Sequence, residues 1–383
     1  MNVLMVSSMV HPAKGGVQTY IDTLISGLTK KGHIVKLIDL SMQSILTDGQ
    51  KVLLHNFRNT ILKKLEEYNA PDLIYNELCK RMLIEIFKHI DVSEFDLIHS
   101  NSGVATEAIK VSFPNKPLVG TVHGSYYSEY LLYMNLPHGY RSLQTEFIKK
   151  FDTSAVSLPD KVITVSSFQD PQMPNISSEK REVIHNGINC SNFQPKYTRN
   201  SPIRIATSGL LIKRKGYDIL LEAALHLMNS QYNFNIDFYG DGDDKEELES
   251  YANTHYLPVT FKGHVPKEVI QKELPEYDFF IQPSRYEPFG LSVTEAMASG
   301  CVVIGSDVGG ILDQIIHLEN GYLFKSESVE SLYGVLINAF ENVSLNKTIA
   351  KRGRKRVEEE FSIEAMCTKT ENVYINLLSN WKR

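Results

Sequence analysis

Two glutamates eight residues apart, Glu287 and Glu295, are the residues of this chain whose type and spacing best suit chemistry. An apolar strand, 279–282, is expected to lead into the loop with Glu287, and a short helix is expected to begin near Gly290 and to carry Glu295. The start of a helix offers free N–H groups and the positive end of its dipole, which suit a phosphate. The two carboxylates can accept hydrogen bonds from sugar hydroxyls beside that phosphate. This combination predicts a pocket for a sugar nucleotide.

Three further segments suit the same ligand, although each also has an ordinary structural explanation. The basic turn 213–216 stands between a strand and a helix, where cations can neutralise a departing diphosphate; a solvated basic turn is an equal alternative. His123 ends an apolar strand and could donate to a substrate hydroxyl, but taken alone a structural histidine is the better explanation. Gly15-Gly16, between the first strand and the first helix, could let the backbone approach a ligand or could form a simple turn.

A metal site is not expected. Asp241-Gly242-Asp243 could be a metal-binding motif, but acids that stabilise the start of the following helix are the favoured explanation. The chain has four cysteines, all far apart and without a Cys-x-x-Cys pair, which argues against both a zinc site and a disulfide framework. Free cysteines fit a reducing cytoplasm.

Composition narrows the class of protein. The chain has 383 residues, enough for two domains, and its 42% hydrophobic and 22% charged residues are ordinary for a soluble protein. A net charge of -5 does not favour a nucleic-acid partner. The first ten residues lack a basic leader and a cleavage site, so a first strand is expected rather than a signal peptide. We therefore expect a cytoplasmic protein.

One stretch suggests contact with the inner face of a membrane. Residues 52–65 combine apolar side chains with Arg58, Lys63 and Lys64, and such a face can bind anionic lipids. A solvated helix face is the better explanation, because Glu66 and Glu67 weaken the basic character of the stretch. Peripheral membrane contact stays an open alternative.

The elements that must position these residues follow an alternating pattern of strands and helices. It appears twice, as 3–6, 17–31 and 34–39 and again as 203–208, 217–228 and 235–239. Such β-α-β units predict two α/β domains with parallel sheets, joined near 186–202. Ligands of open α/β sheets bind beyond the carboxyl ends of the strands, so the cleft between the two domains is the expected site.

Over nearly its whole length the chain resembles the family-four retaining glycosyltransferases of the GT-B fold. The resemblance is carried by Gly15-Gly16, Thr121-Val122-His123-Gly124, Val165-Ser166, His185-Asn186-Gly187-Ile188-Asn189, Gly209, Lys215-Gly216, Tyr239-Gly240-Asp241-Gly242, Phe261-Lys262-Gly263 and the block 283–310 with its Glu-x7-Glu pair. It implies two Rossmann-like domains that face each other across a cleft. Residues 1–187 would form the acceptor-side domain, 188–362 the nucleotide-sugar-binding domain, and 363–383 a helix that packs back on the first domain.

The resemblance also implies roles for individual residues. His123, Glu287 and Lys215 would be catalytic, with Lys215 neutralising the donor diphosphate, Glu287 contacting the transferred sugar and His123 lying beside that sugar. Glu295 would bind the nucleotide ribose. The remaining donor-binding residues would be Gly16, Gly209, Arg214 and the backbone of Phe289, Gly290 and Leu291.

The implied activity is that of a retaining, metal-independent hexosyltransferase without a cofactor. It would move a sugar from a UDP-linked donor to an acceptor hydroxyl, such as that of a lipid-linked sugar, in the synthesis of cell-surface polysaccharide or glycoconjugate. One departure from the family matters: Leu210 stands where an arginine is common, five residues before Lys215. The alternatives are a nucleotide-sugar epimerase and a catalytically weak subunit that binds sugar nucleotides.

Overall fold

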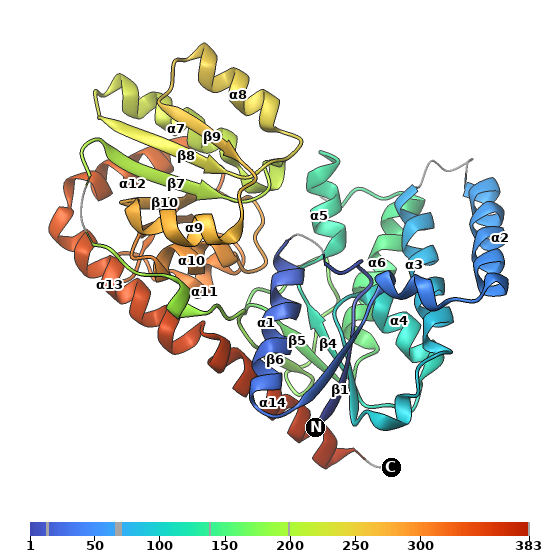
Figure 1. The fold of residues 1–383 in the computed structure, drawn as a ribbon. Coiled ribbons are helices and arrows are strands. Elements are labelled where there is room, and N and C mark those ends of the chain that lie inside the picture. Colours follow the sequence, from blue (N-terminus) through green and yellow to red (C-terminus); the bar gives the residue numbers. More distant parts are fainter. Residues whose placement is uncertain (13–14, 66–70, 138, 198–199, 382–383) are drawn as a thin grey trace. The chain divides into compact units, whose positions relative to one another are not determined.

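The computed structural model describes residues 1–12, 15–65, 71–137, 139–197 and 200–381, and they form two compact units (Figure 1). The N-terminal unit consists of Met1–Val165, Gln169–Ile184 and the chain from Met366 onward. The C-terminal unit consists of Ser166–Phe168 and His185–Ala365.

The N-terminal unit is built on a six-stranded sheet of order β2-β1-β3-β4-β5-β6, in which every neighbouring pair is parallel. The strands are β1 (Asn2–Val6), β2 (Ile34–Ile38), β3 (Leu97–Ser100), β4 (Leu118–Val122), β5 (Lys161–Thr164) and β6 (Arg181–Val183). The helices are α1 (Gly16–Lys30), α2 (Asp48–Leu65), α3 (Pro71–Phe87), α4 (Gly103–Ser112), α5 (Tyr126–Tyr133) and α6 (Leu143–Ser157). The central strands β3 and β4 are buried along their whole length and largely apolar, as expected for a parallel sheet that helices cover on both faces.

The C-terminal unit repeats this design with a parallel sheet of order β12-β11-β10-β7-β8-β9. Its strands are β7 (Ile203–Ser208), β8 (Phe234–Tyr239), β9 (Val259–Gly263), β10 (Phe279–Gln282), β11 (Val302–Ser306) and β12 (Tyr322–Phe324). Its helices are α7 (Tyr217–Asn229), α8 (Lys245–Thr254), α9 (Lys267–Glu273), α10 (Leu291–Ala298), α11 (Ile311–Gln314), α12 (Val329–Glu341) and α13 (Val343–Glu360).

The last helix, α14 (Ile363–Asn380), runs from the C-terminal unit into the N-terminal unit. Within the N-terminal unit, Glu371 accepts a hydrogen bond from His33 Nε2 at 2.8 Å, and the Tyr374 hydroxyl lies 2.6 Å from His99 Nδ1. The apolar side chains of Met366, Val373 and Leu377 on α14 are also buried. The predicted fold class, two Rossmann-like domains with a returning C-terminal helix, is confirmed.

Each sheet contains one point where the strand order reverses, between β1 and β3 in the first and between β7 and β10 in the second. Loops that leave adjacent strands in opposite directions open a crevice there, which is where α/β sheets bind ligands. In the C-terminal unit the loops after β7 and β10 carry Lys215 and Glu287. The topology thus brings together two segments that lie far apart in the sequence.

Among the described helices, we find none with the length and apolar character needed to cross a lipid bilayer.

Candidate functional site

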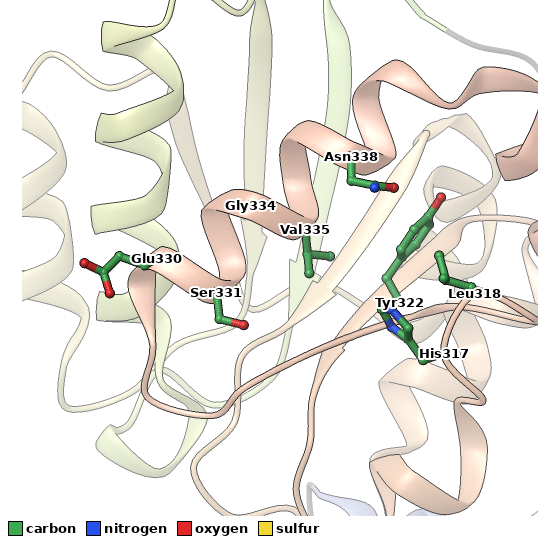
Figure 2. Close-up of a pocket in the computed structure, with 8 residues that line it drawn as sticks. All are labelled: His317, Leu318, Tyr322, Glu330, Ser331, Gly334, Val335 and Asn338. Atoms are coloured by element: carbon green, nitrogen blue, oxygen red, sulfur yellow. The ribbon is translucent and has the colours of Figure 1, made fainter.

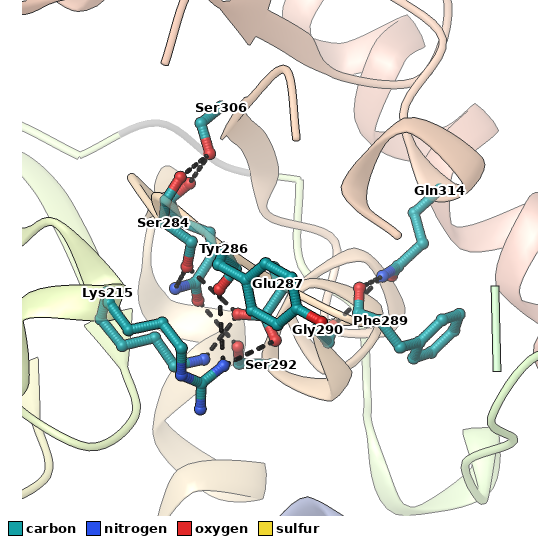
Figure 3. Close-up of polar contacts among 11 residues, drawn as sticks. Lys215, Ser284, Tyr286, Glu287, Phe289, Gly290, Ser292, Ser306 and Gln314 are labelled. Carbon is teal, nitrogen blue, oxygen red and sulfur yellow. Dashed lines mark hydrogen bonds and ion pairs between the residues drawn. The ribbon is translucent and has the colours of Figure 1, made fainter. Parts of the chain in front are cut away.

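An ion pair between Lys215 and Glu287 lies at the centre of the candidate site in the C-terminal unit (Figure 3). Lys215 ends the short 3-10 helix Lys213–Lys215 after β7, and its Nζ lies 2.5 Å from Glu287 Oε2. Both residues are buried: Lys215 is 8% exposed and Glu287 is 5% exposed. Gly216 allows the loops to touch, since its φ is +66° and a Cβ there would lie 2.1 Å from the carbonyl oxygen of Pro283.

Polar side chains from the end of β10 and the loop after it extend the hydrogen bonding of the Glu287 carboxylate. Ser284 Oγ donates to Glu287 Oε2 at 3.1 Å, and Gln282 Nε2 donates to Ser284 Oγ at 2.9 Å. Burial by itself raises the pKa of Glu287. The charges of Lys215 and Arg214 and the hydrogen bonds from Lys215 and Ser284 outweigh it, so the pKa lies below its usual value. Glu287 is therefore ionised at neutral pH.

Arg214 brings a second cation close to the same carboxylate. Its Nη1 lies 4.0 Å from Glu287 Oε1 and donates to the carbonyl oxygen of Tyr286 at 3.4 Å. Lys213 points elsewhere, since its Nζ lies 3.8 Å from Glu247 on α8. Leu210, at the position of the missing arginine, is 57% exposed. Of the two cations before Lys215, Lys213 and Arg214, it is Arg214 that lies beside Glu287.

Helix α10 begins directly after this loop. Gly290 precedes it with a φ of +94°, a conformation that glycine adopts readily. Among the described residues, the backbone N–H groups of Gly290 and Leu291 have no hydrogen-bond acceptor, and no side chain caps the helix start. With the dipole of the helix behind them, these groups can bind an anion.

Glu295 lies within α10, where its side chain is 15% exposed and 3.6 Å from Lys267 Nζ. Burial raises its pKa, and Lys267 offsets only part of that rise. Gly209, at the end of β7, lies close to Lys215, because a Cβ on Gly209 would stand 3.5 Å from the Cε of that lysine. The structure thus gathers Gly209, Arg214, Lys215, Glu287, Phe289, Gly290, Leu291 and Glu295 within one unit.

The other two predicted site residues, His123 and Gly16, belong to the N-terminal unit. His123 follows β4, and its Nε2 lies 3.3 Å from Asn101 Oδ1. Its ring meets the Tyr20 ring edge-on at a centroid distance of 4.7 Å. Burial lowers the pKa of His123 to about 3, so the imidazole is neutral at physiological pH. Gly16 opens α1, and a Cβ there would meet no atom within 4 Å.

A buried chain of hydrogen bonds beside His123 was not foreseen from the sequence. The Tyr374 hydroxyl lies 2.6 Å from His99 Nδ1, His99 Nε2 lies 2.7 Å from Thr121 Oγ1, and Thr121 Oγ1 lies 3.0 Å from the Tyr20 hydroxyl. Burial lowers the pKa of His99 to about 3. Within the sequence, a lone histidine inside the apolar strand Leu97–Ser100 was the available signal.

The segment Asp241-Gly242-Asp243 lies just before α8. Asp241 Oδ1 accepts the backbone N–H of Gly242 at 3.0 Å, and Lys245 Nζ lies 3.7 Å from the same oxygen. Within the described ranges, no group of three or more His, Cys, Asp or Glu side chains is arranged to hold a metal ion.

A pocket of about 250 Å³ lies elsewhere in the C-terminal unit, between β12 and α12 (Figure 2). It is lined by His317, Leu318, Tyr322, Glu330, Ser331, Gly334, Val335 and Asn338. His317 Nδ1 and Ser331 Oγ already accept backbone N–H groups, at 2.9 Å each. None of the predicted donor-binding residues lines this pocket.

Comparison with known proteins agrees with this architecture. An uncharacterized glycosyltransferase of Methanocaldococcus jannaschii is 25% identical over 382 residues, which is 98% of this chain and 99% of that protein. The sucrose-phosphate synthase of Thermosynechococcus elongatus has a similar structure, with a TM-score of 0.76 at 19% identity and 99% coverage of both chains. HepE of Anabaena, solved with UDP and glucose, gives a TM-score of 0.71 at 18% identity, covering 98% of this chain and 100% of that one.

Two family descriptions match consecutive parts of the chain. Glycosyltransferase Family 4 matches residues 14–192, which include Gly16 and His123. Glycosyl transferases group 1 matches residues 191–356, which include Lys215, Glu287 and Glu295. The two matches together run from residue 14 to residue 356, and the chain belongs to the group 1, family 4 glycosyltransferases of the GT-B fold.

Proposed function

We propose that this glycosyltransferase moves a hexose from a UDP-linked donor to an acceptor hydroxyl with retention of configuration. The observation that carries the proposal is the buried Lys215–Glu287 pair next to the free N–H groups of Gly290 and Leu291. Cations and N–H donors suit a diphosphate, and a carboxylate suits sugar hydroxyls. The UDP and glucose held by HepE of Anabaena support the choice of donor.

Charge neutralisation at the leaving group is the main catalytic task in this scheme. As the glycosidic bond to the diphosphate breaks, positive charge develops on the sugar ring and negative charge on the departing phosphate. Lys215 carries three N–H donors, of which the bond to Glu287 uses one. Its remaining donors, Arg214 and the N–H groups at the start of α10 would stabilise the transition state more than the bound donor. These groups supply positive charge without an obligatory metal ion.

The acidic residues and His123 would bind hydroxyl groups. Glu287, ionised at neutral pH, would accept hydrogen bonds from the transferred sugar, and Glu295 would accept them from the ribose. His123, as a neutral imidazole, would donate one hydrogen bond to the sugar.

Retention is assigned to attack on the same face of the sugar from which the diphosphate leaves. A double displacement needs a free carboxylate as nucleophile. Glu287 is held by Lys215 and Ser284 and is therefore a poor candidate. We propose that the acceptor hydroxyl attacks beside the departing phosphate and that a phosphate oxygen takes its proton.

A lipid-linked acceptor at the inner face of the membrane is the proposed setting, in the synthesis of cell-surface polysaccharide or glycoconjugate. Helix α2 supports it, because Val52 and Leu53 are 57% and 61% exposed and Arg58 and Lys63 are exposed on the same helix. The side chain of Lys64 lies outside the described residues. Sedimentation with anionic and neutral vesicles would test this contact. Failure to bind either kind of vesicle would contradict it.

A panel of UDP-, GDP-, ADP- and dTDP-sugars, followed by thermal unfolding, is the first test. A bound donor raises the melting temperature by mass action, so a UDP-sugar should stabilise the protein more than the others. Release of UDP in the presence of an acceptor then measures transfer, and NMR of the product gives the anomeric configuration. An inverted product, or loss of activity in EDTA, would contradict the mechanism.

The same assay separates two further candidates. Conversion of the donor into its epimer without an acceptor would identify a nucleotide-sugar epimerase. Donor binding without transfer would identify a weak binding subunit, an alternative favoured by the exposed Leu210 in place of the family's arginine.

A further inference from the structure

Gln314 holds the backbone that leads into α10. It is the last residue of α11 and is fully buried. Its side-chain Nε2 donates to the carbonyl oxygen of Phe289 at 2.5 Å and lies 3.3 Å from that of Gly290, as Figure 3 shows. Its Oε1 accepts a hydrogen bond from Thr294 Oγ1 at 2.7 Å. Backbone carbonyls can only accept, so the amide nitrogen must face Phe289 and Gly290, and the amide orientation is determined.

The planar peptide bond transmits this orientation to the neighbouring N–H groups. In a trans peptide the C=O of one residue and the N–H of the next point in opposite directions. Because the Phe289 carbonyl faces Gln314, the Gly290 N–H points away from Gln314. The Gly290 carbonyl also accepts the Val293 N–H at 3.0 Å, so the Leu291 N–H points toward the open start of α10.

A glycine at position 290 makes such a restraint necessary. Gly290 has a φ of +94°, and a residue without a Cβ leaves the adjoining peptide planes free to rotate. The loop is pressed onto the segment before α11, where Gly310 N–H donates to the Glu287 carbonyl at 2.8 Å. That contact orients the peptide after Glu287. Among the described residues, Gln314 is the one that donates a hydrogen bond to the Phe289 carbonyl.

We propose that Gln314 is a positioning residue that turns the N–H groups of Gly290 and Leu291 toward the diphosphate of the donor. The inference rests on the proposed function, because it requires the diphosphate to bind at the start of α10. Thr294 acts in the same unit by fixing the Gln314 amide. Replacement of Gln314 should therefore weaken binding of the diphosphate and leave binding of the nucleoside unchanged.

The experiment measures binding of UDP and of uridine by calorimetry to wild type, Gln314→Met and Asn346→Leu. Methionine keeps the length of the side chain and removes its polar atoms. Asn346 is a matched control in the same unit: its Nδ2 donates to the Ala339 carbonyl at 2.6 Å, and its Oδ1 accepts from the Tyr322 hydroxyl at 2.8 Å. Both substitutions remove a buried amide of the same hydrogen-bonding pattern, so both should lower the melting temperature.

Gln314→Met should lower the affinity for UDP at least about tenfold and leave that for uridine within about twofold, whereas Asn346→Leu should change neither. If Gln314→Met does not fold, Thr294→Val carries the test, with a smaller loss of UDP affinity that Thr294→Ser restores. Unchanged UDP affinity in a folded Gln314→Met or Thr294→Val protein, or an equal loss for UDP and uridine, would overturn the inference alone. If none of UDP, GDP, ADP and dTDP binds to the wild type, the proposed function fails first.

Discussion

Each unit contains a buried polar cluster, and the two are built differently. In the C-terminal unit Lys215 and Glu287 form an ion pair, and Ser284 donates a hydrogen bond to Glu287. In the N-terminal unit His99 and Tyr374 belong to a chain of hydrogen bonds in which every member is neutral at physiological pH. One cluster keeps charge beside a proposed phosphate site, and the other joins β3 and β4 to the C-terminal helix.

The difference has consequences for stability and pH. Removing one partner of a buried ion pair leaves an uncompensated charge, which is more destabilising than an unmet neutral hydrogen bond. The ion pair also keeps Glu287 ionised, since its pKa lies below the usual value. The neutral cluster keeps His99 uncharged, since burial lowers its pKa to about 3. A charge that can interact with a ligand is thus available only in the first cluster, whereas the second acts through geometry.

The largest effect is expected from Lys215→Met. It leaves the Glu287 carboxylate buried without its partner, which should cost about 3–5 kcal/mol of unfolding free energy, and turnover should fall by about two orders of magnitude or more. Urea denaturation and release of UDP measure the two quantities.

The control for this prediction is the double variant Lys215→Met with Glu287→Leu. Removal of both charges should restore most of the stability, because a buried ion pair and an apolar pair of similar volume are often close in energy. Activity should remain lost. If Lys215→Met alone were as stable as the wild type, the pair would not be a buried ion pair in solution.

The next effect is expected from Tyr374→Phe in the neutral cluster. The substitution removes the hydroxyl beside His99 Nδ1 and leaves that nitrogen buried and unpaired, which should cost about 1–3 kcal/mol. Chemical denaturation followed by a probe in the N-terminal unit measures it.

Tyr217→Phe in the C-terminal unit is the matched control. Tyr217 is equally buried, but its hydroxyl lies near Thr207 and Gln282 without forming a hydrogen bond of good geometry with any described residue. Its removal should change stability by less than about 0.5 kcal/mol or increase it slightly. Equal losses in the two variants would show that the hydroxyl of Tyr374 contributes no more than that of Tyr217.

The dependence of stability on pH should distinguish the two clusters further. The pKa of His99 falls from 6.5 unfolded to about 3 folded, so between these values the unfolded state binds one more proton. Its stabilising contribution is full above pH 6.5 and declines as the pH falls, by about 1 kcal/mol per pH unit. Glu287 contributes no such slope above its unfolded pKa, because it is ionised in both states there.

His99→Gln tests this assignment between pH 6.5 and 5. The variant should be less stable at pH 7.5 but should show a shallower decline toward pH 5 than the wild type. Denaturant unfolding at several pH values gives both slopes. Parallel slopes for wild type and variant would mean that the pKa of His99 is the same in the folded and unfolded states.

The smallest effect is expected from Leu210→Arg, which introduces the cation that the family commonly has. Because Leu210 is 57% exposed, stability should change by less than about 0.5 kcal/mol. Affinity for UDP should rise a few-fold if the new guanidinium reaches the diphosphate. No gain would indicate that Arg214 already supplies the second positive charge, and Leu210→Lys provides the comparison for charge without the planar guanidinium.

Local sequence patterns predicted much of the fold. Apolar runs such as 279–282 correspond to the observed strand Phe279–Gln282, and the helix expected near Gly290 begins at Leu291. These features follow from the spacing of apolar residues and from the residues that form turns, and both depend on neighbours in the sequence. The roles of the individual site residues remain predictions that the variants above will test.

The long-range polar contacts could not be predicted in this way. Gln314 lies next to an aspartate in an ordinary helical turn, and its sequence neighbours contain no sign that it binds the Phe289 carbonyl. His99 looks like an interruption of an apolar strand, although it pairs with Tyr374 from the last helix. Such contacts join segments whose separation along the chain carries no periodic signal.

The sequence by itself determined the two alternating α/β patterns, the membership in a glycosyltransferase family, and the acidic, basic and glycine residues available for donor binding. Only the tertiary structure decided that Lys215 pairs with Glu287, that Arg214 rather than Lys213 stands beside it, and that Gln314 orients the start of α10. The physical reason is that the spacing of hydrophobic residues and the turn residues determine structure only over a few neighbouring positions of the chain. Ion pairs and buried amides depend on which loops meet at the carboxyl edge of the folded sheet.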